Sequence, residues 1–188
     1  MYAVVGTGES ANTSIRHMVA VVITFLAMMA LVALAGALLL IAPARRSIIT
    51  YVGPDAAALA WAVAVVATLG SLFLSEVAHF TPCLLCWVQR GFMYPLAVVL
   101  ARPSTRSSRL IPAWAIAGSL VSIYHYAIEQ IPSFAESDFC SPSIPCSFVW
   151  VERFGFVTIP FMAMCGFLAI AALSVTYRRW LRFGGSTD

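Results

Sequence analysis

Residues 56–101 read AAALAWAVAVVATLGSLFLSE VAHFTP CLLCWVQRGFMYPLAVVLA. Two apolar stretches, Ala56–Glu76 and Cys86–Ala101, flank a short connection that carries a Cys-x-x-Cys pair. A helix rises about 1.5 Å per residue, so about 20 apolar residues cross a hydrocarbon core of roughly 30 Å. The first stretch is long enough, whereas the second must begin near the membrane surface or extend back toward Thr81. Together they predict two membrane helices with a cysteine pair between them.

The composition of the whole chain indicates a membrane protein. It has 61% hydrophobic and 10% charged residues, whereas a soluble domain has about 25% charged residues. No alternation of period two competes with helices, and three more apolar stretches are present: Met18–Ala42, Leu110–Ile128 and Phe154–Thr176. We predict an all-α membrane protein: a four-helix transmembrane bundle over 56–176, preceded by one extra N-terminal hydrophobic helix over 18–42. Residues 1–17 and 177–188 are predicted tails, and the net charge of +3 gives no indication of a nucleic-acid partner.

The arginines predict the orientation of these helices. All eleven basic side chains are arginines. If every stretch crosses once, eight of them fall on one side: Arg45, Arg46, Arg102, Arg106, Arg109, Arg178, Arg179 and Arg182. The positive-inside rule places these eight, and hence the C-terminal tail, in the cytoplasm. Both cysteine pairs of the chain then face the extracytoplasmic side, where disulfides persist.

The first apolar stretch admits a second interpretation. A signal peptide has an apolar region of about 7–15 residues; Met18–Ala42 is longer, although Ala42-Pro43-Ala44 resembles a cleavage site. Cleavage there would leave Arg45 and Arg46 on the exported side, against the positive-inside rule. We therefore expect a retained helix.

The first cysteine pair, Cys83 and Cys86, is expected at the start of a helix. Thr81 is a suitable N-cap and Pro82 a suitable first helical residue, which puts both sulfurs on one face of the opening turn. Helix N-terminal amides lower a thiol pKa toward the reactive thiolate. Arg90 shares this face, where its permanent charge can stabilise a thiolate or a quinone oxyanion. For the cysteine pair, the alternatives are half of a zinc site and a chance occurrence. For Arg90, the alternative is a side chain that only reaches toward lipid headgroups.

The second pair, Cys140 and Cys146, lies in the predicted outer loop Glu129–Arg153. Pro142 and Pro145 keep this segment from being helical, so we expect an exposed, mobile loop that suits the docking of another protein. A structural disulfide is one alternative. A zinc site made by all four paired cysteines is another, although the arginine next to the first pair would repel the metal.

Two further side chains have a structural interpretation first. Cys165 lies inside an apolar run and is expected to pack as a small hydrophobic residue. His125 lies near the outer end of its helix, at the depth expected for Arg90. It is expected to be a structural residue or, as a second choice, a partner for a quinone carbonyl.

Taken together, these motifs resemble the DsbB/BdbC family of disulfide bond formation proteins. The likeness lies in Leu74-Ser75-Glu76, Pro82-Cys83-Leu84-Leu85-Cys86-Trp87-Val88-Gln89-Arg90, Met93-Tyr94-Pro95-Leu96, Tyr124-His125-Tyr126, and Cys140 with Pro145-Cys146-Ser147. It covers about residues 56–176 and leaves the first helix outside. The resemblance implies a four-helix bundle in the plasma membrane of a prokaryote. Such a protein reoxidises a DsbA-like thioredoxin-fold partner and passes the electrons to ubiquinone or menaquinone.

The same resemblance implies a role for each candidate residue. Cys83 and Cys86 would be the quinone-proximal pair, with Cys86 as the thiolate that contacts the quinone and Arg90 as its electrostatic partner. Cys140 and Cys146 would be the shuttle pair that the reduced partner attacks. The gap between these two cysteines is shorter than in better-known members, which leaves open which of them is attacked.

Two other functions fit parts of the pattern. A vitamin K epoxide reductase-like quinone reductase is also a small helical bundle with a Cys-x-x-Cys motif. That motif usually lies late in the bundle, however, and here it follows the first core helix. A non-enzymatic membrane subunit with structural or zinc-binding cysteines is the alternative from another class. The resemblance implies a DsbA-like thioredoxin-fold protein and membrane lipid as partners, with no resident metal.

Overall fold

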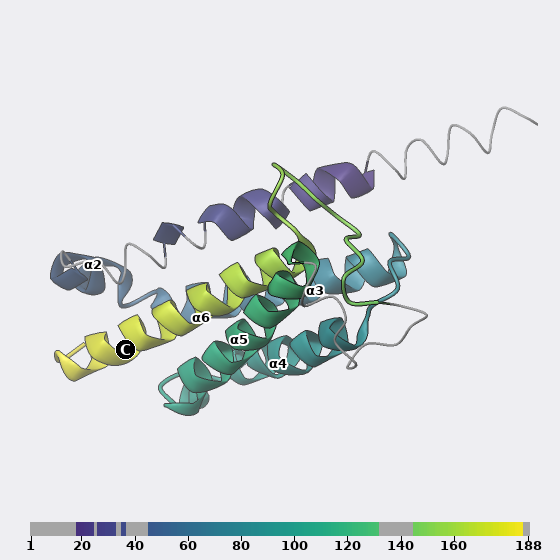
Figure 1. Ribbon diagram of the computed structural model, residues 1–188. Coiled ribbons are helices and arrows are strands. Elements are labelled where there is room, and N and C mark those ends of the chain that lie inside the picture. The colour runs from purple at the N-terminus through teal and green to yellow at the C-terminus, as the bar shows by residue number, and fades with distance from the viewer. Residues whose placement is uncertain (1–17, 25, 33–34, 37–44, 132–144, 186–188) are drawn as a thin grey trace, which may run out of the picture.

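The computed structural model describes residues 18–24, 26–32, 35–36, 45–131 and 145–185, and its long helices form one bundle (Figure 1). Four of them are long and apolar enough to cross a membrane: α3 (Ala56–Glu76), α4 (Leu84–Ala101), α5 (Leu110–Gln130) and α6 (Ile159–Arg182). A short 3-10 helix, η1 (Pro103–Thr105), lies between α4 and α5. Within the described ranges no strand is present, only an isolated antiparallel bridge between Arg153 and Val157. The predicted all-α class with a four-helix core is confirmed.

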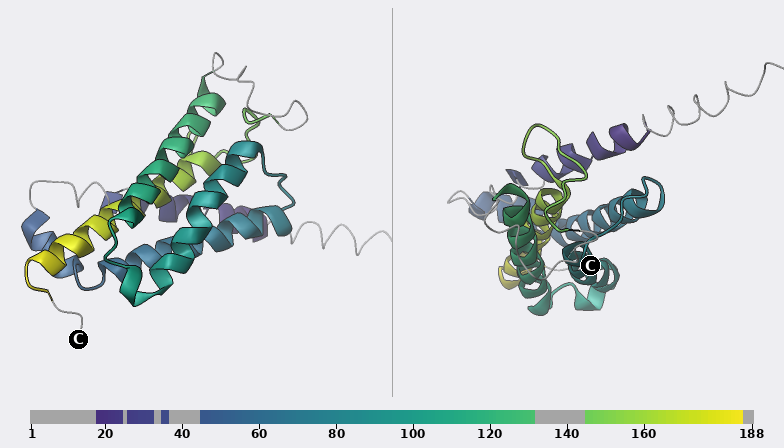
Figure 2. Two further views of the ribbon diagram at one scale, coloured as in Figure 1. Left: turned by 90° about the horizontal axis from the view of Figure 1, so that it is seen from below. Right: turned by 45° about the vertical axis from the view of Figure 1, so that its right-hand side comes forward.

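The helix α6 is the centre of the bundle. It packs against α3, α4 and α5, and the views in Figure 2 keep it next to α5 and α3. The interior is filled by small and medium apolar side chains, which include Ala60, Ala64, Met93, Leu96, Leu100, Ile111, Ala115 and Ile170. Between α5 and α6, a Cβ on Gly118 would lie 2.6 Å from the Phe167 ring. Glycine at this position therefore permits the close approach of the two helices.

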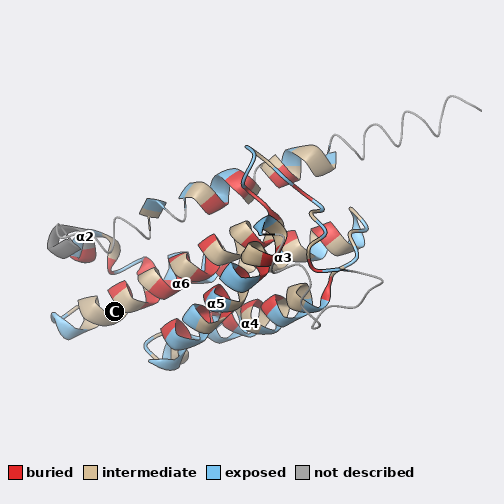
Figure 3. Ribbon diagram, viewed as in Figure 1, coloured by how far each residue is buried: buried red, intermediate tan, exposed pale blue. Residues whose placement is uncertain are grey.

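Large apolar side chains remain exposed on the outside of the bundle. Examples are Leu69 on α3, Val98 on α4 and Leu120 on α5, and Figure 3 shows exposed and buried positions mixed along each of these helices. Soluble proteins rarely expose contiguous apolar surface of this extent. Hydrocarbon is the solvent that matches such a surface, which agrees with the predicted membrane location.

The described part of the extra N-terminal helix packs on α3 (Figure 1, purple). Residues 18–32 are helical where they are described. Leu26 lies over Gly70, and Ile23 packs against Leu74. Residues 35–36 are helical as well, whereas residues 25, 33–34 and 37–42 of the predicted N-terminal helix lie outside the described residues, as does the N-terminal tail.

A short helix before α3 was not expected from the sequence. This helix, α2 (Arg45–Val52), packs against α6. Next to it, Trp180 leaves no room for a Cβ at Gly53, and Tyr177 is buried against the start of α3. These contacts explain why α6 continues through residues 177–182, which were predicted to be tail.

The predicted start of the last helix at Phe154 is wrong. Phe154 and Gly155 have positive φ angles of 57° and 78°, and the backbone N–H of Val157 donates to the oxygen of Arg153 at 2.9 Å. This turn ends at Thr158, whose extended backbone is the N-cap of α6. Hydropathy does not detect the turn because its residues are as apolar as the helix that follows.

Candidate functional site

Cys83 is the N-cap of α4, directly before Leu84. Its backbone is extended, with φ −74° and ψ 175°, and its sulfur accepts a hydrogen bond from the backbone N–H of Cys86 at 3.4 Å. The prediction that Thr81 caps this helix is therefore wrong, and Pro82 precedes the cap. A sulfur occupies the place of the usual capping oxygen. The positive end of the helix dipole consequently favours negative charge on Cys83.

The two sulfurs of the first pair contact each other. Cys83 and Cys86 are free thiols whose Sγ atoms lie 3.2 Å apart, within hydrogen-bond distance. This hydrogen bond, with further help from His125, outweighs burial and lowers the pKa of Cys83 to about 4. A lowered pKa favours the thiolate, and the thiolate is the form that attacks disulfides.

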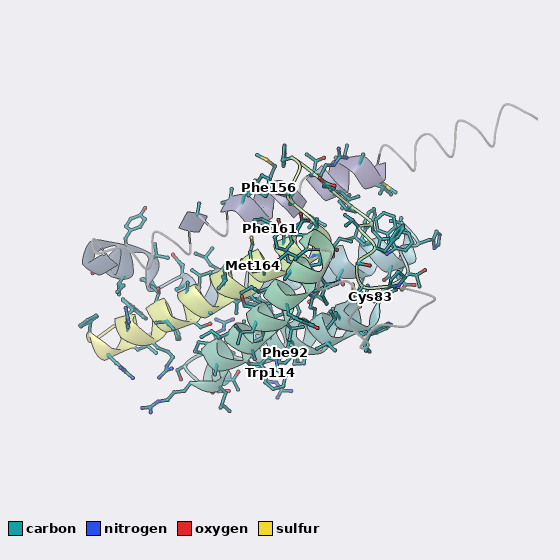
Figure 4. The ribbon with its side chains drawn as sticks, in the orientation of Figure 1. Cys83, Phe92, Trp114, Phe156, Phe161 and Met164 are labelled. Atoms are coloured by element: carbon teal, nitrogen blue, oxygen red, sulfur yellow. The ribbon has the colours of Figure 1, made fainter. Side chains whose placement is uncertain are left out.

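An apolar cavity of about 600 Å³ lies beside this pair. Its walls come from the N-terminal helix, α3, α4 and α6, and the first turns of α4 contribute Cys86, Gln89 and Arg90. Figure 4 shows Cys83 at the end of the bundle opposite the C-terminal end of α6. Cavities of roughly 300–1,000 Å³ with a few polar groups hold small organic ligands. This one suits a ligand with a polar head and an apolar tail.

Arg90 is anchored to the neighbouring helix. Its Nε donates to the Ser71 Oγ at 2.9 Å and its Nη2 donates to the Ser71 backbone oxygen at 3.0 Å. The guanidinium also lies 5.1 Å from the centroid of the Trp87 ring, and it interacts electrostatically with Cys86. The arginine is thus fixed between α3 and α4 at the cavity, not extended toward lipid headgroups.

His125 on α5 faces both cysteine-bearing segments. Its Nε2 lies 3.6 Å from the Cys83 Sγ and 3.2 Å from the backbone oxygen of Cys146. On the other side of the ring, Nδ1 lies 3.3 Å from the amide Nε2 of Gln89. Within the described part of the chain, His125 is not among the residues that line the cavity. A contact between His125 and a quinone stays a prediction.

Cys146 lies against the first pair. It is 2% exposed and packs in one cluster with Cys83 and Ile128. It is disulfide-bonded, and Cys140 lies outside the described residues. The expectation of an exposed loop is wrong at Cys146, because this cluster and the contact with His125 hold it inside the end of the bundle. A disulfide sulfur is not a thiolate ligand, so the predicted alternative of a four-cysteine zinc site does not fit.

A smaller set of residues has the spacing of a metal site. The sulfurs of Cys83 and Cys86 and a ring nitrogen of His125 lie within 4.8 Å of one another. Two thiolates and an imidazole are ligands that zinc accepts. The fixed positive charge of Arg90 acts on Cys86 and opposes a cation there. Zinc content therefore has to be measured with any test of function.

Gln89 and Ser71 were not predicted as functional residues from the sequence. Gln89 follows Cys86 by three residues, which puts both on one side of the helix. A polar amide at that spacing within an apolar stretch is the signal in the sequence that could have identified Gln89. Ser71 gives no such signal, because its partner Arg90 belongs to another helix. Cys165 is fully buried and free, as expected for a packing residue.

Comparison with known proteins gives the class to which the chain belongs. Residues 54–184 match the family model for "Disulfide bond formation protein DsbB", which is well over half of the chain of 188 residues. The chain therefore belongs to the DsbB family of disulfide bond formation proteins. Membership implies a membrane oxidoreductase that takes part in disulfide formation with a thiol–disulfide partner.

Similar curated proteins come from several bacteria. The probable disulfide formation protein C of Bacillus cereus is 42% identical over 119 residues, which are 61% of this chain and 86% of that protein. The disulfide bond formation protein C of Bacillus subtilis is 42% identical over 114 residues, 58% of this chain and 83% of that protein. A probable disulfide formation protein of Coxiella burnetii is 42% identical over 117 residues, covering 60% and 80%. No solved structure matches the chain significantly.

Proposed function

We propose that this protein is a thiol–quinone oxidoreductase that reoxidises a DsbA-like thioredoxin-fold protein and passes the electrons to a membrane quinone. One observation carries the proposal: the two sulfurs of the first pair have different surroundings. Cys83 is buried in one cluster with Cys146 of the second pair and does not line the cavity. Cys86 packs only at the edge of that cluster and lines the apolar cavity together with Arg90. This division suits a relay in which one sulfur exchanges with a disulfide and the other serves an apolar electron acceptor.

The thiol–disulfide steps balance without another reactant. A thiolate of the reduced partner attacks a disulfide between Cys140 and Cys146, and the partner's second thiol resolves the mixed disulfide. The partner leaves oxidised, and the second pair becomes a dithiol. A thiolate of that dithiol then attacks a Cys83–Cys86 disulfide, and resolution leaves the first pair reduced. The net result is that two electrons move from the partner to the first pair.

The two sulfurs of the reduced first pair differ in their tendency to carry charge. The resemblance implies that Cys86 is the thiolate that contacts the quinone, and this role stays a prediction. In the reduced pair, the hydrogen bond with Cys86 lowers the pKa of Cys83, which favours the thiolate at Cys83. Cys86 faces the cavity, so the thiol proton of Cys86 has to leave at the cavity wall before the disulfide forms again.

The residues at the cavity fit a quinone. A bound quinone supplies an acceptor for two electrons and two protons. The apolar wall suits an isoprenoid tail, and Arg90 presents N–H groups that bind a carbonyl oxygen or an oxyanion. Because about 30 mV corresponds to about 1.4 kcal/mol for a two-electron couple, a modest difference in potential drives the transfer without ATP.

We place both cysteine pairs on the extracytoplasmic side of the plasma membrane. The arginine-rich segments are the turn between α4 and α5 and the C-terminal end of α6. Cys83 lies at the opposite end of the bundle (Figure 4). The positive-inside rule then puts the cysteines outside the cytoplasm, where disulfides persist.

The test is quinone reduction by the purified full-length protein with a reduced thioredoxin-fold dithiol as donor, run with ubiquinone and menaquinone analogues. Cys86→Ala is expected to abolish turnover, and Cys165→Ala, the matched control in the core, is expected to keep it. Turnover that persists at the wild-type rate in Cys86→Ala contradicts the proposal.

The same preparation separates the rival functions. A non-enzymatic subunit with a zinc site at Cys83, Cys86 and His125 would contain stoichiometric zinc and show no quinone reduction. The family match favours disulfide formation over a vitamin K epoxide reductase-like activity. Absence of any reaction with a thioredoxin-fold dithiol, together with reduction of a quinone epoxide, would reverse that preference.

A further inference from the structure

We infer that Gln89 and His125 form a positioning pair, in which the Gln89 amide fixes the tautomer and orientation of the imidazole. One His125 N–H then serves both the Cys83 sulfur and the Cys146 backbone carbonyl. The purpose of this pair rests on the proposed function, because it concerns exchange between the two cysteine pairs. Its geometry does not, and it is testable without a quinone or a partner protein.

The hydrogen-bond partners determine the tautomer. The amide nitrogen of Gln89 is a donor, and it lies 3.3 Å from Nδ1 of His125. Nδ1 therefore accepts, and a neutral imidazole that accepts at Nδ1 carries its hydrogen on Nε2. That Nε2–H points toward two acceptors, the Cys83 Sγ at 3.6 Å and the Cys146 oxygen at 3.2 Å.

Burial makes this arrangement costly to change. His125 is 2% exposed and Gln89 is 6% exposed, so water does not replace a lost partner. A buried donor or acceptor without a partner is penalised. Gln89 consequently holds the ring in place from α4, on the side opposite to the sulfur. Polar contacts link α4, α5 and the segment of Cys146 through this one ring.

Because one N–H is shared between two acceptors, the charge on Cys83 affects how firmly His125 holds the segment of Cys146. When Cys83 is a thiolate, it is the stronger acceptor and takes the larger share of the Nε2–H. When Cys83 is bonded to Cys86 in a disulfide, its sulfur is uncharged, and the carbonyl of Cys146 takes the hydrogen. The pair therefore holds Cys146 most firmly against an oxidised first pair, which is the state that the second pair must reduce.

Gln89 is the residue to substitute in a test of this pair, because it carries no charge. The titratable and charged groups that act on Cys83 and its neighbour are Cys86 and Arg90 from α4 and His125 and Glu129 from α5. Cys146 contributes a carbonyl. Substituting Gln89 leaves all of these groups in place and removes only the hydrogen bond to Nδ1 of the His125 imidazole.

The experiment compares Gln89→Met with Gln130→Met, an exposed glutamine at the end of α5. Both are purified in detergent and reduced, and alkylation of Cys83 by a small uncharged reagent is followed against pH with site-resolved mass spectrometry. In Gln89→Met the midpoint is expected to rise by about one pH unit or more, which is about tenfold less thiolate below the midpoint. Gln130→Met is expected to match the wild type.

Rescue and an independent readout complete the test. Gln89→Glu, whose carboxylate accepts from Nδ1–H and favours the imidazolium, is expected to bring the midpoint back to the wild-type value or below. Nitrogen chemical shifts of His125, measured in His17→Asn/His79→Asn protein, are expected to show the Nε2–H tautomer. A Gln89→Met profile equal to the wild type, an equal shift in Gln130→Met, or the Nδ1–H tautomer overturns the inference. None of these readouts depends on quinone turnover, so failure of the proposed function remains distinguishable.

Discussion

Removal of the Arg90 charge is expected to slow quinone reduction much more than it affects folding. An arginine has five N–H donors, and Ser71 takes two of them, at Nε and Nη2, which leaves three for a ligand in the cavity. Loss of one hydrogen bond from a charged donor costs about 1.5–3 kcal/mol. Arg90→Met should therefore lower the quinone-dependent kcat/KM by roughly 10- to 150-fold, since about 1.4 kcal/mol is a factor of ten.

The assay is steady-state reduction of a soluble quinone analogue at saturating dithiol donor. Arg106→Met is the matched control, because the Arg106 Nε also donates a hydrogen bond, in this case to the backbone oxygen of Leu100 at 2.9 Å, but Arg106 does not line the cavity. Arg90→Lys keeps the charge without the fork of donors and is expected to recover part of the loss. A kcat/KM within about twofold of wild type in Arg90→Met, or an equal loss in Arg106→Met, would refute the assignment.

Two further predictions concern the pH response and the core. The alkylation rate of Cys83 should stay level from neutral pH down to about pH 5. It should fall as the pH passes below the Cys83 pKa of about 4, because only then is the thiolate protonated. A midpoint near 8–9, as in a free thiol, would contradict this prediction. Gly118→Leu should lower the free energy of unfolding by about 1–3 kcal/mol through overpacking against Phe167. Gly91→Leu, where a Cβ meets nothing within 4 Å, should have little effect, as read by thermal unfolding in detergent.

The number and type of the long membrane helices could be predicted from the sequence because hydrocarbon imposes one requirement on every residue of a span. An apolar stretch that is long enough must be helical to satisfy its backbone hydrogen bonds. The ends of the helices obey a different rule. Cys83 caps α4 in place of Thr81, and α6 starts at Ile159 after a turn made of apolar residues. Hydropathy carries no information about such local backbone geometry.

The cysteines and Arg90 could be predicted as candidates because reactive and charged side chains are rare in an apolar chain. Their partners could not be predicted. Gln89 contacts a residue 36 positions away, and Cys83 contacts one 42 positions away. Both contacts depend on how α4 and α5 are rotated about their axes when they pack. Periodicity within one helix gives the face of a side chain but not the face opposite to it on the neighbouring helix.

The position of the first pair at a helix start also explains how two cysteines of one short motif acquire different surroundings. Inside a helix, residues three apart lie on the same face, so both sulfurs would face the same neighbours. Cys83 is instead the N-cap, with an extended backbone, and its side chain departs from the helical arrangement. It turns toward α5 and Cys146, while Cys86, in the first turn, faces the cavity. The sulfurs stay 3.2 Å apart, close enough to share a proton in the dithiol. A shift of the helix start by one turn toward Thr81 would remove this difference, and with it the physical basis for a relay between a protein disulfide and an apolar acceptor.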